Sequence, residues 1–420
     1  SLIICGIVGV FGWKLILALY PQYFEIQQGF TYNGHWYITF FVFLSLAITF
    51  AIYKKFTNKF NEPPYYLAPL LFWLLINVAV FIFLKGAAFF IIPVFFALLS
   101  FFVMLRQERP NLLAMALLAA PSLFLFAPLI QFFPVGLGLK MLVISCVFTV
   151  LLFGLLWPVF GYYKMKGLLS TVCLLLAILF FGIAHSKSDF SEERRKPNSL
   201  VYYKDADADK TYWLTYDKEI DEWTRQYLGE NPEDASKILG DVAYNKYGTK
   251  FSFANAAPQK TIPDFEVILK ADTLVENLRK VKFIIVPKRK VNKIDLYAEN
   301  TEFQSLIFNG KEMPASRISE DYRGTRNSAL INYYVSENDS LKVQFSVAGE
   351  APVTFKVMEY SFDLMDDAQF NITKRPDYTM PKPFVITDAV AVKRTFSVDS
   401  LRAKVIDTFQ TNLQNSLMYE

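Results

Sequence analysis

The feature that most constrains this 420-residue chain is a nearly continuous apolar stretch from Leu2 to Ala184. From Lys187 to Glu420 the sequence is instead charged, rich in Tyr and Asp, and compatible with water. The whole-chain averages of 53% hydrophobic and 20% charged residues therefore describe neither part. We interpret residues 1–186 as a polytopic transmembrane helical domain, residues 187–198 as a linker, and residues 199–420 as a non-cytoplasmic β-rich domain of one or two subdomains.

The apolar part divides into seven segments, each long enough to cross roughly 30 Å of hydrocarbon at about 1.5 Å per helical residue. Helices are required because a bilayer offers no water to unpaired backbone groups, and the segments lack the alternation of barrel strands. The first is too long, and has too little positive charge before it, for a cleaved signal peptide. The predicted spans are Leu2–Tyr20, Trp36–Tyr53, Tyr65–Leu84, Ala87–Leu105, Leu112–Phe133, Met141–Phe160 and Leu168–Ala184.

Cations in the short loops predict the orientation of this bundle. The loops after the second, fourth and sixth spans contain several Lys and Arg residues, whereas the first loop, residues 21–35, contains none. The positive-inside rule therefore places Ser1 in the cytoplasm and the polar domain outside. A basic cluster within residues 187–196 argues the other way, but long translocated domains contribute little to this rule. The chain also begins without an initiator Met, and we expect it to be part of a longer protein.

Polar groups are scarce inside the predicted spans, and no Asp or Glu lies well inside any of them. An ion-coupled transporter normally keeps ionisable groups at mid-membrane, so a transporter is the less favoured function. We expect the Lys14 side chain to reach the headgroup level. We expect Asn77 and Gln131 to form hydrogen bonds to neighbouring helices. Three prolines are expected to kink or break helices: Pro121, Pro128 and Pro158.

Aromatic rings crowd the first loop, and we interpret them as a belt at the membrane interface in preference to a ligand pocket. His35 and His185, the two histidines of the chain, fall at the same membrane edge and could meet. Two imidazoles without a nearby carboxylate pair make a poor zinc site, so we favour two separate interfacial groups. The belt residues are Tyr20, Tyr23, Phe24, Tyr32, Trp36 and Tyr37.

The sequence contains no HExxH, GxSxG, Walker or dinucleotide-binding glycine motif. All three cysteines, Cys5, Cys146 and Cys173, fall within spans, so the polar domain has no disulfide and must depend on its own apolar core. We assign no catalytic, cofactor-binding or metal-binding residue to this chain.

Short β-branched and aromatic runs, broken by turn residues, predict a β-sandwich or jelly-roll in the polar domain. Helices are expected at Asp221–Leu228, at Pro232–Tyr244 after an Asn231 cap, and in the tail Asp399–Tyr419. The predicted strands are Leu200–Tyr203, Thr211–Tyr216, Phe265–Leu269, Val281–Val286, Lys293–Ala298, Ser305–Phe308, Ala329–Val335, Ser340–Val347, Val353–Ser361 and Val390–Phe396.

Two charged motifs in this domain have simple interpretations. Asp205, Asp207 and Asp209 alternate as in a calcium loop, but the Gly and closing Glu of an EF-hand are missing, so a solvated hairpin turn is favoured. The run Lys288-Arg289-Lys290, with Lys293, indicates a charge cluster at a strand edge or turn. With a net charge of only +4 and no interleaved aromatic residues, no nucleic-acid partner is expected.

Residues at the junction of the two parts resemble a known family. Lys196-Pro-Asn-Ser-Leu-Val-Tyr-Tyr-Lys-Asp-Ala-Asp, continuing through Thr211-Tyr-Trp-Leu-Thr-Tyr-Asp217 to Asp221-Glu-Trp-Thr224, is similar to the start of the C-terminal domain of membrane-bound M28-family metallopeptidases. These are bacterial relatives of the endoplasmic reticulum metallopeptidase and the vacuolar membrane protease. Tyr-Pro-Gln-Tyr at 20–23 and Asn-Gly-His-Trp-Tyr at 33–37 resemble the family's first outer loop.

The resemblance implies a larger protein with an amino-terminal di-zinc aminopeptidase-like domain, about nine spans and a non-cytoplasmic C-terminal domain. The family's zinc ligands and catalytic Glu lie in the amino-terminal domain, and no residue of this sequence matches them. The chain is then expected to anchor or support a catalytic domain outside it, to be inactive alone, and to have the lipid bilayer and that domain as partners. The alternative is a stand-alone membrane-tethered β-sandwich module that binds a sugar, peptide or envelope component.

Overall fold

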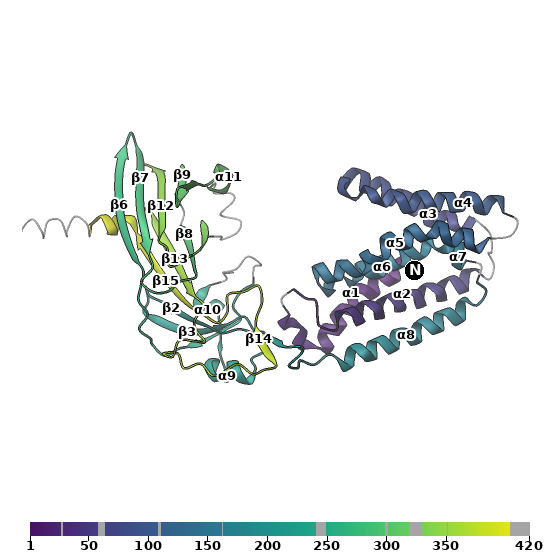
Figure 1. The fold of residues 1–420 in the computed structure, drawn as a ribbon, viewed down its shortest axis with the longest axis horizontal. Coiled ribbons are helices and arrows are strands. Elements are labelled where there is room, and N and C mark those ends of the chain that lie inside the picture. Colours follow the sequence, from purple (N-terminus) through teal and green to yellow (C-terminus); the bar gives the residue numbers. More distant parts are fainter. Residues whose placement is uncertain are drawn as a thin grey trace, which may run out of the picture. The chain divides into compact units, whose positions relative to one another are not determined.

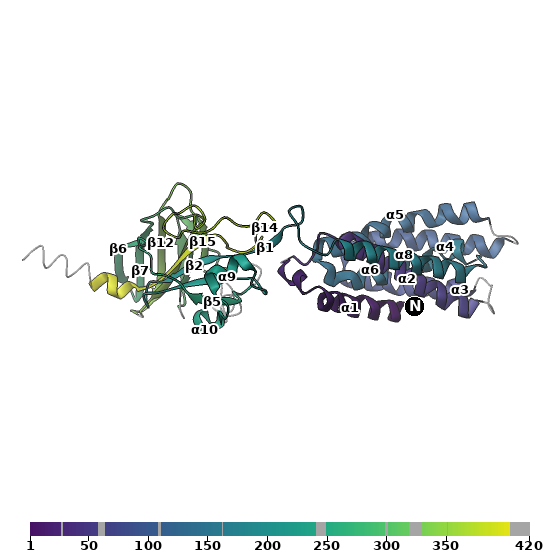
Figure 2. The ribbon, with the colours of Figure 1, turned by 90° about the horizontal axis from the view of Figure 1, so that it is seen from below.

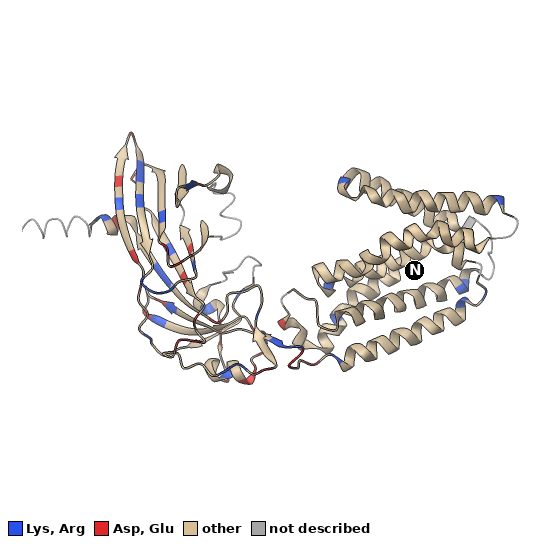
Figure 3. Ribbon diagram, viewed as in Figure 1, with Lys and Arg blue, Asp and Glu red and all other residues tan. Residues whose placement is uncertain are grey.

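A computed structural model describes residues 1–26, 28–57, 64–107, 111–161, 163–240, 249–298, 301–318, 329–350 and 352–403. The chain forms two units, which are Ser1–Lys196 and Pro197–Glu420. The first is helical and the second consists mainly of β-sheets (Figures 1 and 2). Lys, Arg, Asp and Glu gather near helix ends in the helical unit, whereas the β unit carries them along its strands (Figure 3).

Within the described residues, six helices are long and apolar enough to cross a membrane, which indicates a membrane protein. Their lengths follow from the apolar runs, because Lys14, in the first helix, is the one charge among the described residues of these helices that lies more than a turn from a helix end. They are α1 (Leu2–Leu19), α2 (Gly34–Thr57), α3 (Pro64–Phe83), α4 (Ile91–Arg106) with the preceding η2 (Lys85–Phe90), α5 (Leu112–Leu137) and α8 (Lys166–Ser186).

The sixth of the seven predicted crossings, Met141–Phe160, is not confirmed as a single helix. It is divided into η3 (Leu139–Met141), α6 (Leu142–Leu155) and α7 (Trp157–Phe160). Pro158 explains the break near Leu156, because a proline has no N–H with which to continue the α6 hydrogen-bond ladder. The 14 residues of α6 measure about 21 Å at about 1.5 Å per residue, less than the roughly 30 Å of hydrocarbon.

Of the two predicted outcomes, a kink or a break, the break does not occur at the other two prolines. Helix α5 continues through Pro121 and Pro128, and also through Pro134. Pro134 cannot donate to the carbonyl of Ile130, and the Ser145 hydroxyl of α6 donates to that oxygen at 2.5 Å instead. A neighbouring helix thus supplies the hydrogen bond that the proline removes, which is how such residues are tolerated in apolar bundles.

Polar side chains also connect other helices of the bundle. Ser170 in α8 donates to the Ala47 carbonyl of α2 at 2.8 Å, and the Trp73 indole in α3 donates to the Leu151 carbonyl of α6 at 3.1 Å. Asn77, predicted to bond a neighbouring helix, donates instead to Trp73 O of its own helix at 3.0 Å. Interhelical hydrogen bonds matter here because lipid tails are as apolar as the helix surfaces, so hydrophobic burial provides little attraction between helices.

A close backbone approach joins α1 to α6. A Cβ atom added to Gly9 would lie 2.5 Å from the Val143 Cα atom and 3.2 Å from the Cys146 Sγ atom. Only a glycine fits this position, because the obstructing atoms include backbone that cannot rotate away. The contact therefore sets the spacing between the two helices.

In the β unit, the largest sheet has eight strands in the order β11-β8-β13-β15-β2-β3-β5-β4, and a second sheet has five, β10-β9-β12-β7-β6. Strands β1 and β14 form a separate pair. The bounds are β1 (Lys196–Asn198), β2 (Val201–Asp205), β3 (Lys210–Thr215), β4 (Glu233–Asp234), β5 (Phe253–Ala256), β6 (Glu266–Val275), β7 (Leu278–Val286), β8 (Lys293–Ala298), β9 (Ser305–Phe308), β10 (Lys311–Glu312), β11 (Ile331–Tyr334), β12 (Leu341–Ala348), β13 (Thr354–Ser361), β14 (Thr379–Pro381) and β15 (Ala389–Ser397).

The ten predicted strands all have counterparts, and the predicted hairpin is confirmed. Strands β2 and β3 pair antiparallel, with Val201 opposite Leu214. The connecting turn places Asp209 at φ 48°, a left-handed conformation that Asp tolerates better than most residues. Strand β2 also pairs with β15, and this pair is parallel.

The two larger sheets share one apolar core. Phe283 of β7 and Phe345 of β12 meet Phe355 of β13, with ring centroids 5.1 Å and 5.5 Å apart. This arrangement is compatible with the predicted β-sandwich. A second core lies where α9 (Glu222–Leu228) and residues 364–372 pack on the β2 and β3 side chains, among them Tyr202 and Trp213.

The helix predictions for the β unit had mixed outcomes. Helix α9 confirms the first, and Asp221 caps it by accepting from Thr224 N at 2.9 Å. The prediction of a helix over Pro232–Tyr244 is wrong in its described part, which contains β4 and the short α10 (Ser236–Leu239), ending at Gly240 with φ 69°. Residues 241–244 lie outside the described residues. In the predicted C-terminal helix, residues 398–403 are helical and the rest lies outside the described part. The remaining helix is α11 (Ala315–Ile318).

The Gly9 contact yields a first prediction. Gly9→Leu should force α1 and α6 apart and destabilise the protein by about 1–3 kcal/mol, the usual cost of overpacking. Thermal unfolding of the detergent-solubilised protein would measure this as a lower melting temperature. Gly182→Leu in α8 is the matched control, since nothing lies within 4 Å of a Cβ there. Equal melting temperatures for the two variants would contradict the assigned contact.

Candidate functional site

A cluster of hydrogen-bonded polar and aromatic side chains lies at one end of the helical unit, which we call the exit end because α8 finishes there at Ser186. A cap made of η1 (Pro21–Glu25) and residues 28–33 covers this end. Asn33 is its central residue: its amide donates to the Tyr23 hydroxyl at 2.8 Å and to the Ala184 carbonyl of α8 at 2.7 Å. The Tyr23 and Tyr37 hydroxyls lie 3.1 Å apart. The Ala184 carbonyl also accepts from Lys187 N at 3.2 Å, so the cap adds a second hydrogen bond at the end of α8.

The residues of the predicted aromatic belt differ in how far they are buried in the structure. Tyr20, Tyr23 and Tyr37 are buried inside the cap, whereas Phe24 and Tyr32 are 56% and 46% exposed. The sequence could not separate the two sets, because their composition is the same and only the partners differ. The buried rings hold the cap together, and the exposed rings are the ones suited to a membrane interface.

The two histidines have different partners. His185 Nδ1 lies 2.7 Å from the Tyr20 hydroxyl, and His35 Nδ1 lies 3.2 Å from Gln131 Nε2. The His35–Gln131 contact joins α2 to α5, which confirms the prediction that Gln131 bonds a neighbouring helix. In the described part of the chain, no three His, Cys, Asp or Glu residues are placed to hold a metal.

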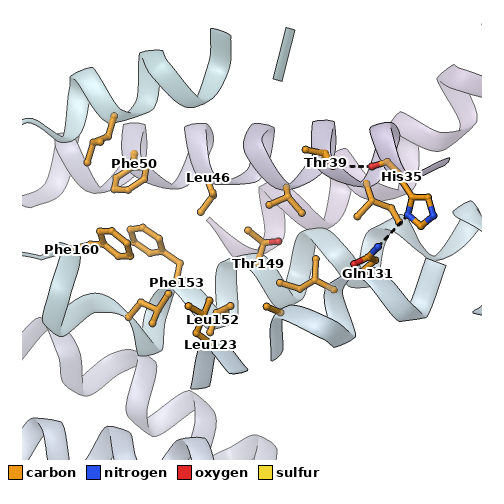
Figure 4. Close-up of a pocket in the computed structure, with 16 residues that line it drawn as sticks. His35, Thr39, Leu46, Phe50, Leu123, Gln131, Thr149, Leu152, Phe153 and Phe160 are labelled. Carbon is orange, nitrogen blue, oxygen red and sulfur yellow. Dashed lines mark hydrogen bonds between the residues drawn. The ribbon is translucent and has the colours of Figure 1, made fainter. Parts of the chain in front are cut away.

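A groove of about 570 Å³ begins at this bridge and continues between α2 and α5 (Figure 4). Helix α6 forms its floor through Thr149, Leu152 and Phe153. The bridge closes one end, and the rings of Phe50, Phe153 and Phe160 lie at the other. Its volume falls in the range of small-molecule sites, roughly 300–1,000 Å³. The lining is apolar apart from His35, Thr39, Gln131 and Thr149.

A second polar cluster lies inside the β unit, around Glu359 of β13. Both carboxylate oxygens of Glu359 are buried and accept no hydrogen bond from a described residue. The nearest cation is Arg289, whose Nε lies 3.9 Å from Glu359 Oε2 and whose guanidinium also donates to Ser361 Oγ. Burial raises the pKa of Glu359 to about 7, against the opposing effect of Arg289. Its carboxyl is therefore poised to exchange a proton near neutral pH.

Residues 288–290 of the basic run lie in the bend between β7 and β8, which agrees with the predicted turn. Lys288 is partly exposed and pairs with Glu266 at 2.6 Å. Arg289 and Lys293, however, are directed inward, and Lys293 Nζ lies 2.7 Å from the buried Asp295 carboxylate. Burial raises the pKa of Asp295, and the Lys293 charge opposes that rise. Two of the four cations thus lie beside buried carboxylates, which the prediction did not include.

A third cluster joins the start and the end of the β unit. Ser199 Oγ donates to Asp217 Oδ1 at 2.8 Å, and Lys382 Nζ donates to the same oxygen at 3.1 Å. Ser, Lys and Asp side chains together can suggest nucleophilic catalysis, but these three are almost fully buried, at 0%, 3% and 0% exposure. A substrate would have no access to them, so the arrangement acts as a structural clamp between residues 199, 217 and 382.

The aspartate triplet runs from Asp205, the last residue of β2, into the predicted hairpin turn, but two of its carboxylates have partners on β15. Lys393 Nζ lies 3.0 Å from Asp205 Oδ2 and 3.4 Å from Asp207 Oδ2, and Asp207 also accepts from Thr395 N at 2.9 Å. The carboxylates of Asp205 and Asp207 are thus directed toward β15, where they reinforce the pairing of β2 with that strand.

Comparisons with known proteins add no relatives to this description. No protein-family model matches the chain, and no curated protein matches it. The candidate sites are therefore defined by their geometry.

The raised pKa of Glu359 predicts a pH dependence of stability. Because the folded value of about 7 exceeds the ordinary 4.5, folding favours the protonated form. This group's contribution should be fully present below about pH 4.5 and should be lost as pH rises to about 7. Between pH 5 and pH 8, the melting temperature of Glu359→Gln should fall less than that of the wild type.

The matched control is Glu266→Gln, which changes an acid that is about half exposed in its surface pair with Lys288. It should retain the pH dependence of the wild type. If Glu359→Gln and the wild type show the same slope of melting temperature against pH, Glu359 does not titrate in this range.

Proposed function

We propose that this chain is the membrane-embedded and outer-domain part of a membrane-bound zinc peptidase of the M28 type. In this proposal it anchors and supports a catalytic domain that lies outside the chain. The finer topology belongs to the same proposal: seven crossings, with α6 and α7 together as the sixth, Ser1 in the cytoplasm and the β unit in the periplasm.

The observation that best supports the proposal is the position of the segment that resembles this family. Residues 196–224 become β1, β2, β3 and α9. Strands β2 and β3 lie in the interior of the eight-stranded sheet, and Ser199 and Asp217 form the buried clamp with Lys382. The residues of the resemblance are thus the framework of the β unit, not a surface motif that unrelated proteins acquire easily.

A supporting role also agrees with the chemistry of the described side chains. The clamp is closed to solvent, and in the Glu359 cluster the carboxyl and the Ser361 hydroxyl are buried as well. In the proposal, zinc is bound by His, Asp and Glu residues of the separate peptidase domain. The bundle and the β unit would determine where that domain is held.

Measurements of peptidase activity test whether catalysis requires the separate domain. The purified 420-residue chain should show no zinc-dependent cleavage of aminoacyl substrates, because no residue of this sequence matches the family's zinc ligands. The product of the complete coding sequence should cleave them and lose activity when a chelator removes zinc. The comparison requires the same detergent and the same zinc concentration for both proteins.

Two outcomes would reject the proposal. One is zinc-dependent cleavage by the chain alone. The other is a coding sequence that starts at or just before Ser1 and encodes no peptidase domain, which would favour a stand-alone binding module.

A separate prediction concerns sidedness. A reporter enzyme that is active only outside the cytoplasm should be active when fused after Glu420, because the cations of the short loops place the β unit outside. The same reporter inserted after Lys55, at the opposite end of α2 from the cap, should be inactive. The reverse pattern would invert the proposed topology.

A further inference from the structure

The groove between α2 and α5 is built by the spacing of residues along each helix. On α2 the lining positions are 35, 38, 39, 42, 46 and 50, and on α5 they are 123, 127, 130 and 131. Steps of three, four and seven keep side chains on one face of a helix, so each helix presents a continuous stripe. The stripes face each other across the floor formed by α6, as Figure 4 shows.

Hydrogen-bonding capacity in the groove is confined to one end. Thr149 lies on the floor, but its hydroxyl donates to Ser145 O within α6 at 2.7 Å. The Thr39 hydroxyl donates to His35 O at 2.9 Å. Only His35 and Gln131, at the exit end, present polar atoms beyond those used within their own helices, and no lining residue is acidic. An occupant must therefore be apolar along most of its length and polar at one end.

The dimensions favour an extended hydrocarbon chain. From His35 to Phe50 the α2 stripe extends about 22 Å at about 1.5 Å per residue, more than the roughly 15 Å depth of one leaflet. A volume of about 570 Å³ spread over that length describes a long, narrow space, which suits an extended hydrocarbon chain.

We propose that the groove holds one acyl chain of a membrane phospholipid, with the phosphate end of the lipid at the His35–Gln131 bridge. The imidazole and the amide supply donors for phosphate or ester oxygens there. Lys140 of η3 and Lys187 at the end of α8 add positive charge at the exit end, and Lys187 Nζ lies 5.5 Å from the ring centroid of Trp36, next to His35. This assignment does not depend on the proposed peptidase.

The physical origin of such binding sets its strength. A lipid chain that enters the groove leaves one apolar environment for another, so its transfer gains little hydrophobic free energy. Binding depends instead on van der Waals contact with the stripes and on hydrogen bonds at the polar end. We therefore expect a lipid that exchanges with the bilayer and is retained in mild detergent.

The test is native mass spectrometry of the whole chain, extracted in mild detergent, to count the phospholipids that remain bound. Ala127→Trp places a large ring in the groove from the α5 side, where Ala127 is exposed and not part of the packed core. It should reduce the bound fraction about tenfold, equivalent to about 1.4 kcal/mol. Gln131→Leu should reduce the bound fraction less, because it removes the polar contact with the lipid but leaves the apolar lining of the groove intact.

Ala51→Trp is the matched control, since Ala51 lies on α2, is exposed, and is one residue from Phe50 and five from Leu46, which places it off the groove stripe. It should retain lipid as the wild type does. Equal retention in Ala127→Trp, Ala51→Trp and the wild type would overturn the proposal. So would a wild-type protein that carries only detergent or a co-purified peptide.

A second measurement uses only the wild-type protein, so it does not depend on whether a variant folds. A phospholipid with a photoreactive group on its acyl chain should label the floor and walls of the groove, among them Leu152 and Phe153. Labelling confined to outward-facing positions such as Leu75 of α3, which is 66% exposed, would mean that lipid covers the bundle without entering the groove. That result would overturn the proposal.

Discussion

The whole helical unit depends on one constraint, the cost of an unpaired backbone group in hydrocarbon. Water is absent there, so each N–H or C=O that a helix leaves open needs a partner from the protein. The structure meets this requirement at its weak points. Ser145 bonds the Ile130 carbonyl that Pro134 cannot reach, and Asn33 bonds the Ala184 carbonyl near the end of α8. The first bond holds α5 against α6, and the second holds the cap against α8. These contacts set the positions of the helices around the groove.

The β unit buries charged side chains, and these also need partners inside the protein. Arg289, Lys293 and Lys382 are each buried beside a carboxylate, and these pairs lie along or next to the eight-stranded sheet. A buried ion pair contributes little net stability, because desolvation offsets most of the attraction. Removing one partner is costly, however, since it leaves a charge uncompensated. A strand register that separated these partners would leave buried charges unpaired and would therefore be costly.

The features that were predicted well depend on local sequence, and the others depend on distant partners. Apolar runs and β-branched runs determined nearly all helices and strands, and Asp221 marked the start of α9 because a cap is a local signal. The local composition of residues 288–293 could not reveal that Arg289 would meet Glu359, 70 residues away. Similarly, Pro232 suggested a helix start, but pairing of β4 with β5 overrode that signal. For the groove, Gln131 was correctly expected to bond another helix, while its partner His35 was not predicted.

The parallel pair of β2 and β15 has a consequence for biogenesis. Strand β2 is synthesised near the start of the β unit, and its neighbour begins only at Ala389. At about 5–20 residues per second, translation reaches that strand roughly 10–40 s later. The β2–β3 hairpin can form early, but one edge of β2 stays open throughout this interval, and an open strand edge is a template for mispairing. The nascent protein is thus most vulnerable to aggregation or to capture by chaperones just before the ribosome finishes the last strand.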